Sequence, residues 1–258
     1  MFTFNQIIDL EDFKSKYIDY LKTLSFETTE FNEEQIYNSD VFEINQNKTY
    51  VGFYVYSNKE NTLFKFYVID DYRTQESEII DLIIKKHGIK KIEVATFDSI
   101  LLNLAIERQK RVSVLGIYFK DHKKVIPHLD NFPKATFRAA EITDMDRIVK
   151  ISNNFFDELE HRIERNELFL LENNNEILGI GICVWSYYDN NVASIGIFTN
   201  EKYRQKGIGK YIISKLKENE KKKDMIVNCG CEIDNKNSKK TLEGAGFIPY
   251  ARQLLIEV

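Results

Sequence analysis

The residues of this sequence best suited to chemistry form a short loop, Arg204-Gln-Lys-Gly207-Ile-Gly209. An apolar run of strand length precedes the loop at 195–198, and a helical pattern of apolar residues follows it at 208–216. Glycines let the main chain approach a ligand closely, and the first amides of a helix have no partner inside the helix. Because Arg204, Lys206 and Lys210 add positive charge, we expect this loop to bind a phosphate group.

Two common phosphate-binding motifs do not fit these residues. A nucleotide-binding P-loop needs a serine or threonine after its Gly-Lys pair and a glycine five positions before that pair's glycine, but Tyr211 follows Lys210 and the earlier position is Arg204. The dinucleotide motif needs a third glycine where Ile212 stands. A nucleotide-binding module would be protected against heat by ATP or NAD, and we expect no such protection.

Composition limits the class of protein. The chain has 258 residues, enough for one large domain or two of ordinary size, and 43% of them are hydrophobic. A formal net charge of −4 argues against non-specific nucleic-acid binding, and no apolar run approaches the length of a membrane span. We see no signal peptide at the N-terminus, and three cysteines without paired spacing argue against disulfides and a zinc site. We therefore expect a cytoplasmic protein with no nucleic-acid or membrane partner, either a monomer or a homodimer.

Hydrophobic periodicity divides the chain into two parts, with Pro127 and Pro133 framing the boundary. In 1–130 it predicts, in order, a helix at 7–24, a hairpin of strands at 41–44 and 49–56, a strand at 63–69, a helix at 77–86, a strand at 91–96, a helix at 100–109 and a last strand at 112–119. His87-Gly88 is expected to end the helix at 77–86, since glycine adopts the left-handed conformation readily.

The second part, 135–258, shows its own succession of elements. We predict a strand at 135–139, a helix reaching Phe155, strands at 167–171 and 177–187, the strand and helix around the glycine loop, a strand at 225–231, a helix at 235–243 and an edge strand at 254–258. The predicted fold class is α/β (α+β), with a mixed central sheet flanked by helices.

Two motifs in this second part resemble those of the GCN5-related N-acetyltransferase (GNAT) family. The strand followed by Arg204-x-x-Gly207-x-Gly209 and a helix resembles the family's motif A. The segment from Asn235 through Ser238 to Gly246-Phe247 resembles its Asn-x-x-Ala/Ser … Gly-Phe signature, with Asn235 capping a helix. The order strand, helix, three strands, helix, strand, helix, strand is also that of the GNAT fold. The resemblance covers about 135–258.

The resemblance implies acetyl-CoA as co-substrate and assigns the residues that would hold it. Ile197, Phe198 and Thr199 would form a splayed strand edge along the pantetheine arm, and a backbone N–H near Ile197 would stabilise the developing oxyanion. Asn235 and Ser238 would contact the pantetheine side. The pyrophosphate would be held by Arg204, Gln205, Lys206, Gly207, Ile208, Gly209 and Lys210.

The first part reads as a second copy of the same fold. Val51-Gly52 corresponds to Leu178-Gly179, and the segment ending in Tyr72-Arg73 corresponds to that ending in Tyr203-Arg204. The positions of Gly207 and Gly209, however, are occupied by Glu76 and Glu78, whose carboxylates would repel a pyrophosphate. We therefore predict tandem GNAT-like domains in which 1–130 is degenerate and binds no cofactor, and helps to cover or shape the acceptor side of 135–258.

The usual proton-transfer residues of the family are absent. Many members carry a tyrosine where this chain has Leu242, and some carry a glutamate where it has Gly230. A water chain or another side chain could serve in place of the missing groups. Among Glu232, Asp234, Glu160, His161 and Tyr250, each of which more often is an ordinary surface or packing residue, Glu232 is our candidate for the catalytic base. Cys229 and Cys231 could suggest a covalent acyl intermediate, although alternate residues on a buried strand more often only pack there.

The sequence thus predicts an acetyl-CoA-dependent N-acetyltransferase acting on an unidentified amine of a small molecule or peptide, by direct attack in a ternary complex. The alternative is a non-catalytic acyl-CoA-binding regulatory or scaffolding protein, which the residues at 230 and 242 favour. The acceptor and the length of the acyl chain are left open.

Overall fold

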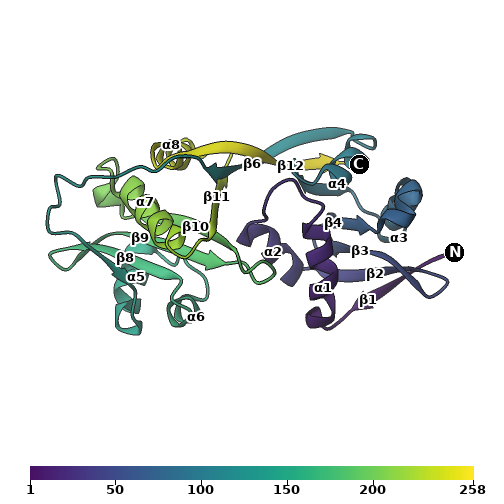
Figure 1. The fold of residues 1–258 in the computed structure, drawn as a ribbon, viewed down its shortest axis with the longest axis horizontal. Coiled ribbons are helices and arrows are strands. Elements are labelled where there is room, and N and C mark those ends of the chain that lie inside the picture. Colours follow the sequence, from purple (N-terminus) through teal and green to yellow (C-terminus); the bar gives the residue numbers. More distant parts are fainter.

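A computed structural model describes all residues, 1–258, and shows an elongated molecule with two halves side by side (Figure 1). A single sheet of 12 strands runs through both halves in the order β1-β2-β3-β4-β5-β12-β6-β11-β10-β9-β8-β7. None of the helices combines the length and apolar composition needed to span a bilayer. The predicted fold class, a mixed sheet flanked by helices, is confirmed.

Helices cover both faces of the first half. Helices α3 and α4 pack on one face around a core that includes Ile80 and Leu101, and α1 and α2 pack on the other around Phe13 and Ile36. The elements of this half are β1 (Phe2–Ile7), α1 (Leu10–Leu21), α2 (Glu30–Tyr37), β2 (Asp40–Gln46), β3 (Thr49–Ser57), β4 (Thr62–Val68), the 3-10 turn η1 (Asp70–Gln75), α3 (Glu76–His87), β5 (Lys91–Ala95), α4 (Ser99–Ile106) and β6 (Arg111–Asp121).

The second half repeats this layering. Helices α7 and α8 pack on one face of its sheet around Ile212 and Leu242, and α5 and α6 pack on the other around Ile148 and Ile163. Its elements are β7 (Thr136–Ala139), η2 (Ile142–Asp144), α5 (Met145–Ser152), α6 (Leu159–Glu164), β8 (Leu168–Asn173), β9 (Glu176–Trp185), β10 (Val192–Thr199), η3 (Glu201–Tyr203), α7 (Ile208–Lys221), β11 (Ile226–Glu232), α8 (Lys236–Gly244) and β12 (Phe247–Glu257).

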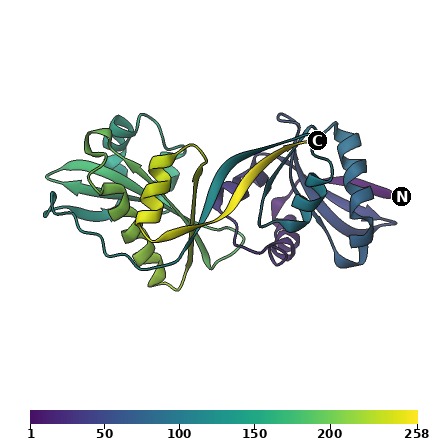
Figure 2. The same ribbon diagram turned by 90° about the horizontal axis from the view of Figure 1, so that it is seen from above.

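The two halves exchange their last strands. Strand β6 leaves the first half and pairs with β11 over 116–120, whereas β12 leaves the second half and pairs with β5 over 253–257. The two long strands also pair with each other along almost their whole length, and Figure 2 shows them crossing between the halves. Each half therefore needs the other to complete its sheet.

Several predictions about elements are wrong or incomplete; the helix predicted to reach Phe155, for example, ends at Ser152. The segment 254–258 is not an edge strand, because β12 lies between β5 and β6 inside the sheet. Ile7 belongs to β1 rather than to a helix, and the first helix begins only after Asp9, whose carboxylate accepts a hydrogen bond from the Glu11 amide. Helix α2 was not predicted, because polar residues make up most of its buried side.

The internal repeat is visible in the sheet register. Gly52 of β3 pairs with the last residue of β4, Val68, and Gly179 of β9 pairs with the last residue of β10, Thr199. Arg73 follows Val68 at the same distance along the chain as Arg204 follows Thr199. The two phosphate-loop positions are therefore equivalent in the fold, and the predicted tandem arrangement is confirmed.

Candidate active site

The predicted phosphate loop joins β10 to α7 and is exposed between Arg204 and Gly207. Gln205 and Gly207 both have positive φ, 62° and 82°, which turns the chain sharply into the helix. No hydrogen bond within the protein uses the amides of 205–210 as donors; the first amide of the helix with an internal partner is that of Tyr211, which donates to the Gly207 carbonyl at 3.0 Å. The loop therefore presents a set of free N–H groups at a helix N-terminus.

The two glycines of the loop serve different purposes. Gly207 has open space where a Cβ would lie, so it is required by its positive φ. A Cβ on Gly209 would instead lie 2.8 Å from Ile197 Cδ1 and 3.1 Å from Thr241 Cγ2. Gly209 therefore allows α7 to start directly against β10 and α8, which brings the loop to the end of the predicted cofactor strand.

Strands β10 and β11 separate before β10 reaches this loop. They pair in parallel only from Val192 to Ser194 and from Ile226 to Asn228, after which β11 continues alongside β6. The edge of β10 that faces β11 is consequently unpaired from Ile195 to Thr199. The predicted cofactor residues Ile197, Phe198 and Thr199 all lie on this open edge, and the expected splay is present.

The remaining predicted residues lie on β11 and at the start of α8, across from the open edge of β10. Asn235 is the N-cap of α8, and its side chain accepts a hydrogen bond from the Ser238 amide at 3.0 Å, as predicted. Cys229 and Cys231 point into the core under α7 and α8, so the alternation of a strand places Gly230 and Glu232 on the opposite face. Glu232 is exposed at the end of β11 and forms no ion pair. Phe198 packs on that same face, against the core under α5 and α6.

The positions of the missing acid and base are occupied differently. Leu242 is buried in the core beneath α7 and α8. Gly230 is exposed beside Tyr118 of β6, and a Cβ there would lie 3.8 Å from Tyr118 Cδ1. Burial raises the pKa of the Cys229 thiol well above its usual value, which argues against a nucleophilic thiolate at that position.

Sequence reasoning missed an aromatic cluster next to Phe198. The ring of Phe155 lies 5.4 Å from that of Phe198, and the ring of Phe156 lies 6.2 Å from it. Phe155 is 62% exposed, so its ring is available to a ligand on this face of the sheet. The signal in the sequence was weak, because two adjacent phenylalanines at the end of a helical pattern also suit a core.

The equivalent site in the first half is closed by its own side chains. Arg73, the counterpart of Arg204, forms an ion pair with Glu76 at 2.9 Å. Strands β4 and β5 also separate, after Leu63 and Ile92, but a polar link crosses between them. Lys65 Nζ of β4 donates to Gln35 Oε1 of α2 at 2.6 Å, and Gln35 Nε2 donates to Glu93 Oε1 of β5 at 2.8 Å.

This link predicts a pH effect on stability. Burial lowers the pKa of Lys65 from 10.5 to about 8 in the folded protein, so between these values the unfolded chain binds the extra proton. Raising the pH from 8 to 10 should therefore stabilise the protein relative to a Lys65→Met variant, by about 2 kcal/mol. Urea unfolding of both proteins across this pH range measures the difference between their free energies of unfolding. Ionisation of the tyrosines affects both proteins equally and cancels in this difference. If the free energies of the two proteins changed in parallel with pH, the lowered pKa of Lys65 would be contradicted.

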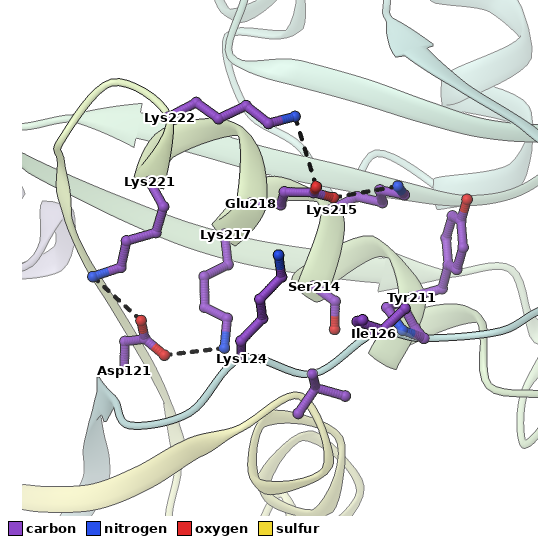
Figure 3. Close-up of a pocket in the computed structure, with 12 residues that line it drawn as sticks. Asp121, Lys124, Ile126, Tyr211, Ser214, Lys215, Lys217, Glu218, Lys221 and Lys222 are labelled. Atoms are coloured by element: carbon purple, nitrogen blue, oxygen red, sulfur yellow. Dashed lines mark hydrogen bonds and ion pairs between the residues drawn. The ribbon is translucent and has the colours of Figure 1, made fainter.

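A separate groove lies along the outer side of α7. It has a volume of about 520 Å³ and is bounded by the segment 121–127 that connects the halves (Figure 3). Asp121 and Glu218 each pair with two of its five lysines, whereas Lys124 forms no ion pair and extends into the groove. None of the residues that line this groove lies on β10 or β11, so it is not part of the candidate site.

Comparisons with known proteins find one family in both halves. A model described as acetyltransferase (GNAT) domain matches residues 8–122, and one described as acetyltransferase (GNAT) family matches residues 129–247. No curated protein sequence matches this chain.

Solved structures share the fold over the whole chain. An acetyltransferase of the GNAT family from Colwellia psychrerythraea is 19% identical, with a TM-score of 0.89 and 99% of each chain covered. A tandem GNAT protein from the clavulanic acid biosynthesis pathway is 11% identical, with a TM-score of 0.65, covering 99% of this chain and 97% of that one. A GCN5-related N-acetyltransferase from Sphaerobacter thermophilus is 9% identical, with a TM-score of 0.64, covering 98% and 94%.

Proposed function

Because the chain belongs to the GNAT family of acetyltransferases, as a tandem of two such halves, we propose that its second half transfers the acetyl group of acetyl-CoA to an amine of a small molecule or peptide. The observation that carries this proposal is the set of unpartnered amides at 205–210, which follows the end of the β10 edge that β11 leaves open. A diphosphate on these amides would direct the pantetheine arm along the open edge of Ile197, Phe198 and Thr199. Asn235 and Ser238 would border the arm from the other side.

In the proposed reaction a neutral amine attacks the thioester carbonyl in a ternary complex. The new C–N bond forms, the C–S bond breaks, CoA leaves as the thiolate, and the amine loses one proton. A backbone N–H near Ile197 would stabilise the oxyanion. Glu232 is the carboxylate of β11 that shares a sheet face with Phe198 and has no ion-pair partner, which supports it as the proton acceptor.

We assign the first half a structural role rather than a second cofactor site. At the position equivalent to the phosphate loop, Glu76 forms an ion pair with Arg73. Gln35 lies between the separated strands β4 and β5 and forms hydrogen bonds to Lys65 of β4 and Glu93 of β5. A diphosphate there would meet the carboxylate of Glu76. These contacts support a single cofactor site in the chain.

The alternative function is that of an acyl-CoA-binding protein without turnover. The burial of Leu242 and the absence of a side chain at Gly230 favour it, because neither position can transfer a proton. Both functions require CoA binding, so binding alone does not separate them.

Release of free thiol from acetyl-CoA, followed with a panel of small amines and peptide amines, tests the proposal. We expect amine-dependent thiol release from the wild-type protein and none from a Gly207→Glu variant. Calorimetric binding of acetyl-CoA with no release on any amine would support the non-catalytic alternative. Absence of CoA binding would overturn both.

A further inference from the structure

The point where β10 and β11 part is held by a closed set of hydrogen bonds. The last backbone pair of the two strands is Ser194 with Asn228. Ser194 Oγ donates to Asn228 Oδ1 at 2.9 Å, which joins the two strands a second time through their side chains. Asn228 is fully buried, although it lies in an otherwise largely apolar strand.

The first half supplies the other two contacts. Asn228 Nδ2 donates to the Thr28 carbonyl at 2.9 Å, and the Glu30 amide donates to Ser194 Oγ at 3.0 Å. Thr28 and Glu30 flank Thr29, the N-cap of α2. The side chain of Asn32 holds this N-terminus in place, because it accepts a hydrogen bond from the Thr29 amide and donates one to the Tyr118 hydroxyl at 3.0 Å. A ring of four groups thus connects one rigid segment of the first half to both strands of the second.

Polar side chains in a strand core are costly unless they are hydrogen-bonded. The remaining side-chain hydrogen bonds of Ser194 and Asn228 are both made to the segment Thr28–Glu30. Without the first half, the buried amide of Asn228 would lack its acceptor. The ring therefore couples the separation of the two strands to the position of α2.

The ring lies directly at the start of the candidate cofactor groove. Ile197 follows Ser194 by three residues, or about 10 Å along an extended strand. Misplacement of reacting groups by 1 Å can lower a rate by about 100-fold. A small change in the angle between the strands at Ser194 would be carried to the edge at 197–199.

We infer that Ser194 and Asn228 are positioning residues, through which the first half sets the opening of the acetyl-CoA groove in the second half. The inference rests on the proposed function for the location of the cofactor, but not on turnover. It gives the degenerate half a defined task, which is to hold the strands apart at a fixed angle.

The test compares Ser194→Ala with Ser186→Ala. Ser186 also forms a hydrogen bond between the halves, to Glu33 of α2, but it lies in the loop between β9 and β10, outside the groove. Affinities are measured by calorimetry for two ligands, acetyl-CoA and 3′-phospho-ADP, which carries the diphosphate without the pantetheine arm. Thermal unfolding of each variant shows that it is folded at the temperature used.

For Ser194→Ala we expect affinity for acetyl-CoA to fall by about tenfold, or about 1.4 kcal/mol, while 3′-phospho-ADP binds within about twofold of wild type. Ser186→Ala should leave both affinities within about twofold. Equal effects of Ser194→Ala on the two ligands, or none on either, would overturn the inference, as would a wild-type protein that binds neither. If the wild type binds both ligands but releases no thiol with any amine, only the proposed transferase activity fails.

Discussion

Gly207→Glu should abolish CoA binding while the protein stays folded. The substitution places a carboxylate among the free amides of 205–210, as the first half already does with Glu76, and like charges brought together in a binding site cost several kcal/mol. No atom lies within 4 Å of a Cβ at this position, so the penalty for folding is the positive φ of 82°, about 1–2 kcal/mol. Titration calorimetry should show affinity for CoA reduced by about 100-fold or more.

Gly88→Glu is the matched control for this variant. Gly88 also has a positive φ, 63°, and open space at its Cβ, but it ends α3 in the first half. The same substitution there should lower the melting temperature to a similar degree and leave the affinity for CoA unchanged. Undiminished CoA affinity in Gly207→Glu, or equal losses in both variants, would refute the role given to the loop.

Tyr188→Ala should destabilise the whole protein by about 3–5 kcal/mol, the range for removing a large buried aromatic ring. Tyr188 belongs to the loop between β9 and β10 of the second half, yet its side chain is buried in the core of the first, 4.4 Å from the ring of Tyr17. Because the halves also exchange β6 and β12, we expect one cooperative transition in urea rather than two.

The neighbouring residue provides the comparison. Tyr187 also contacts the first half, through Glu11 and Lys14, but it is 41% exposed. Tyr187→Ala should cost about 1 kcal/mol or less, as is usual for exposed polar contacts. If both alanine variants were equally stable, or if the halves unfolded separately, the shared core would not hold the molecule together as described.

Features encoded by neighbouring residues could be read from the sequence. The turn at Gly207, the exit of α3 at Gly88 and the cap at Asn235 all depend on the conformational preferences of single residues and their immediate neighbours. The correspondence between the two halves could also be read from local patterns, because Gly52 lies opposite the end of β4 and Gly179 lies opposite the end of β10.

Features that depend on the other half could not be read in the same way. Strand β12 has an ordinary strand pattern, and nothing local to it indicates that it completes the sheet of the opposite half. The buried side of α2 carries Asn32, Glu33 and Gln35, and each of them has a hydrogen-bond partner distant in sequence. The sequence of α2 therefore lacks the apolar periodicity that marks a helix packed on a core. Asn228, a lone amide in an apolar strand, was the available sign of the contact between the halves.

The most direct test of the account is a crystal structure of the protein with CoA. We predict that the diphosphate accepts hydrogen bonds from the main-chain amides of 205–210 and that the pantetheine arm runs along the open edge of β10, between Ile197 and Asn235. A coenzyme seated in the lysine groove beside Lys124, or in the first half near Arg73, would contradict the account.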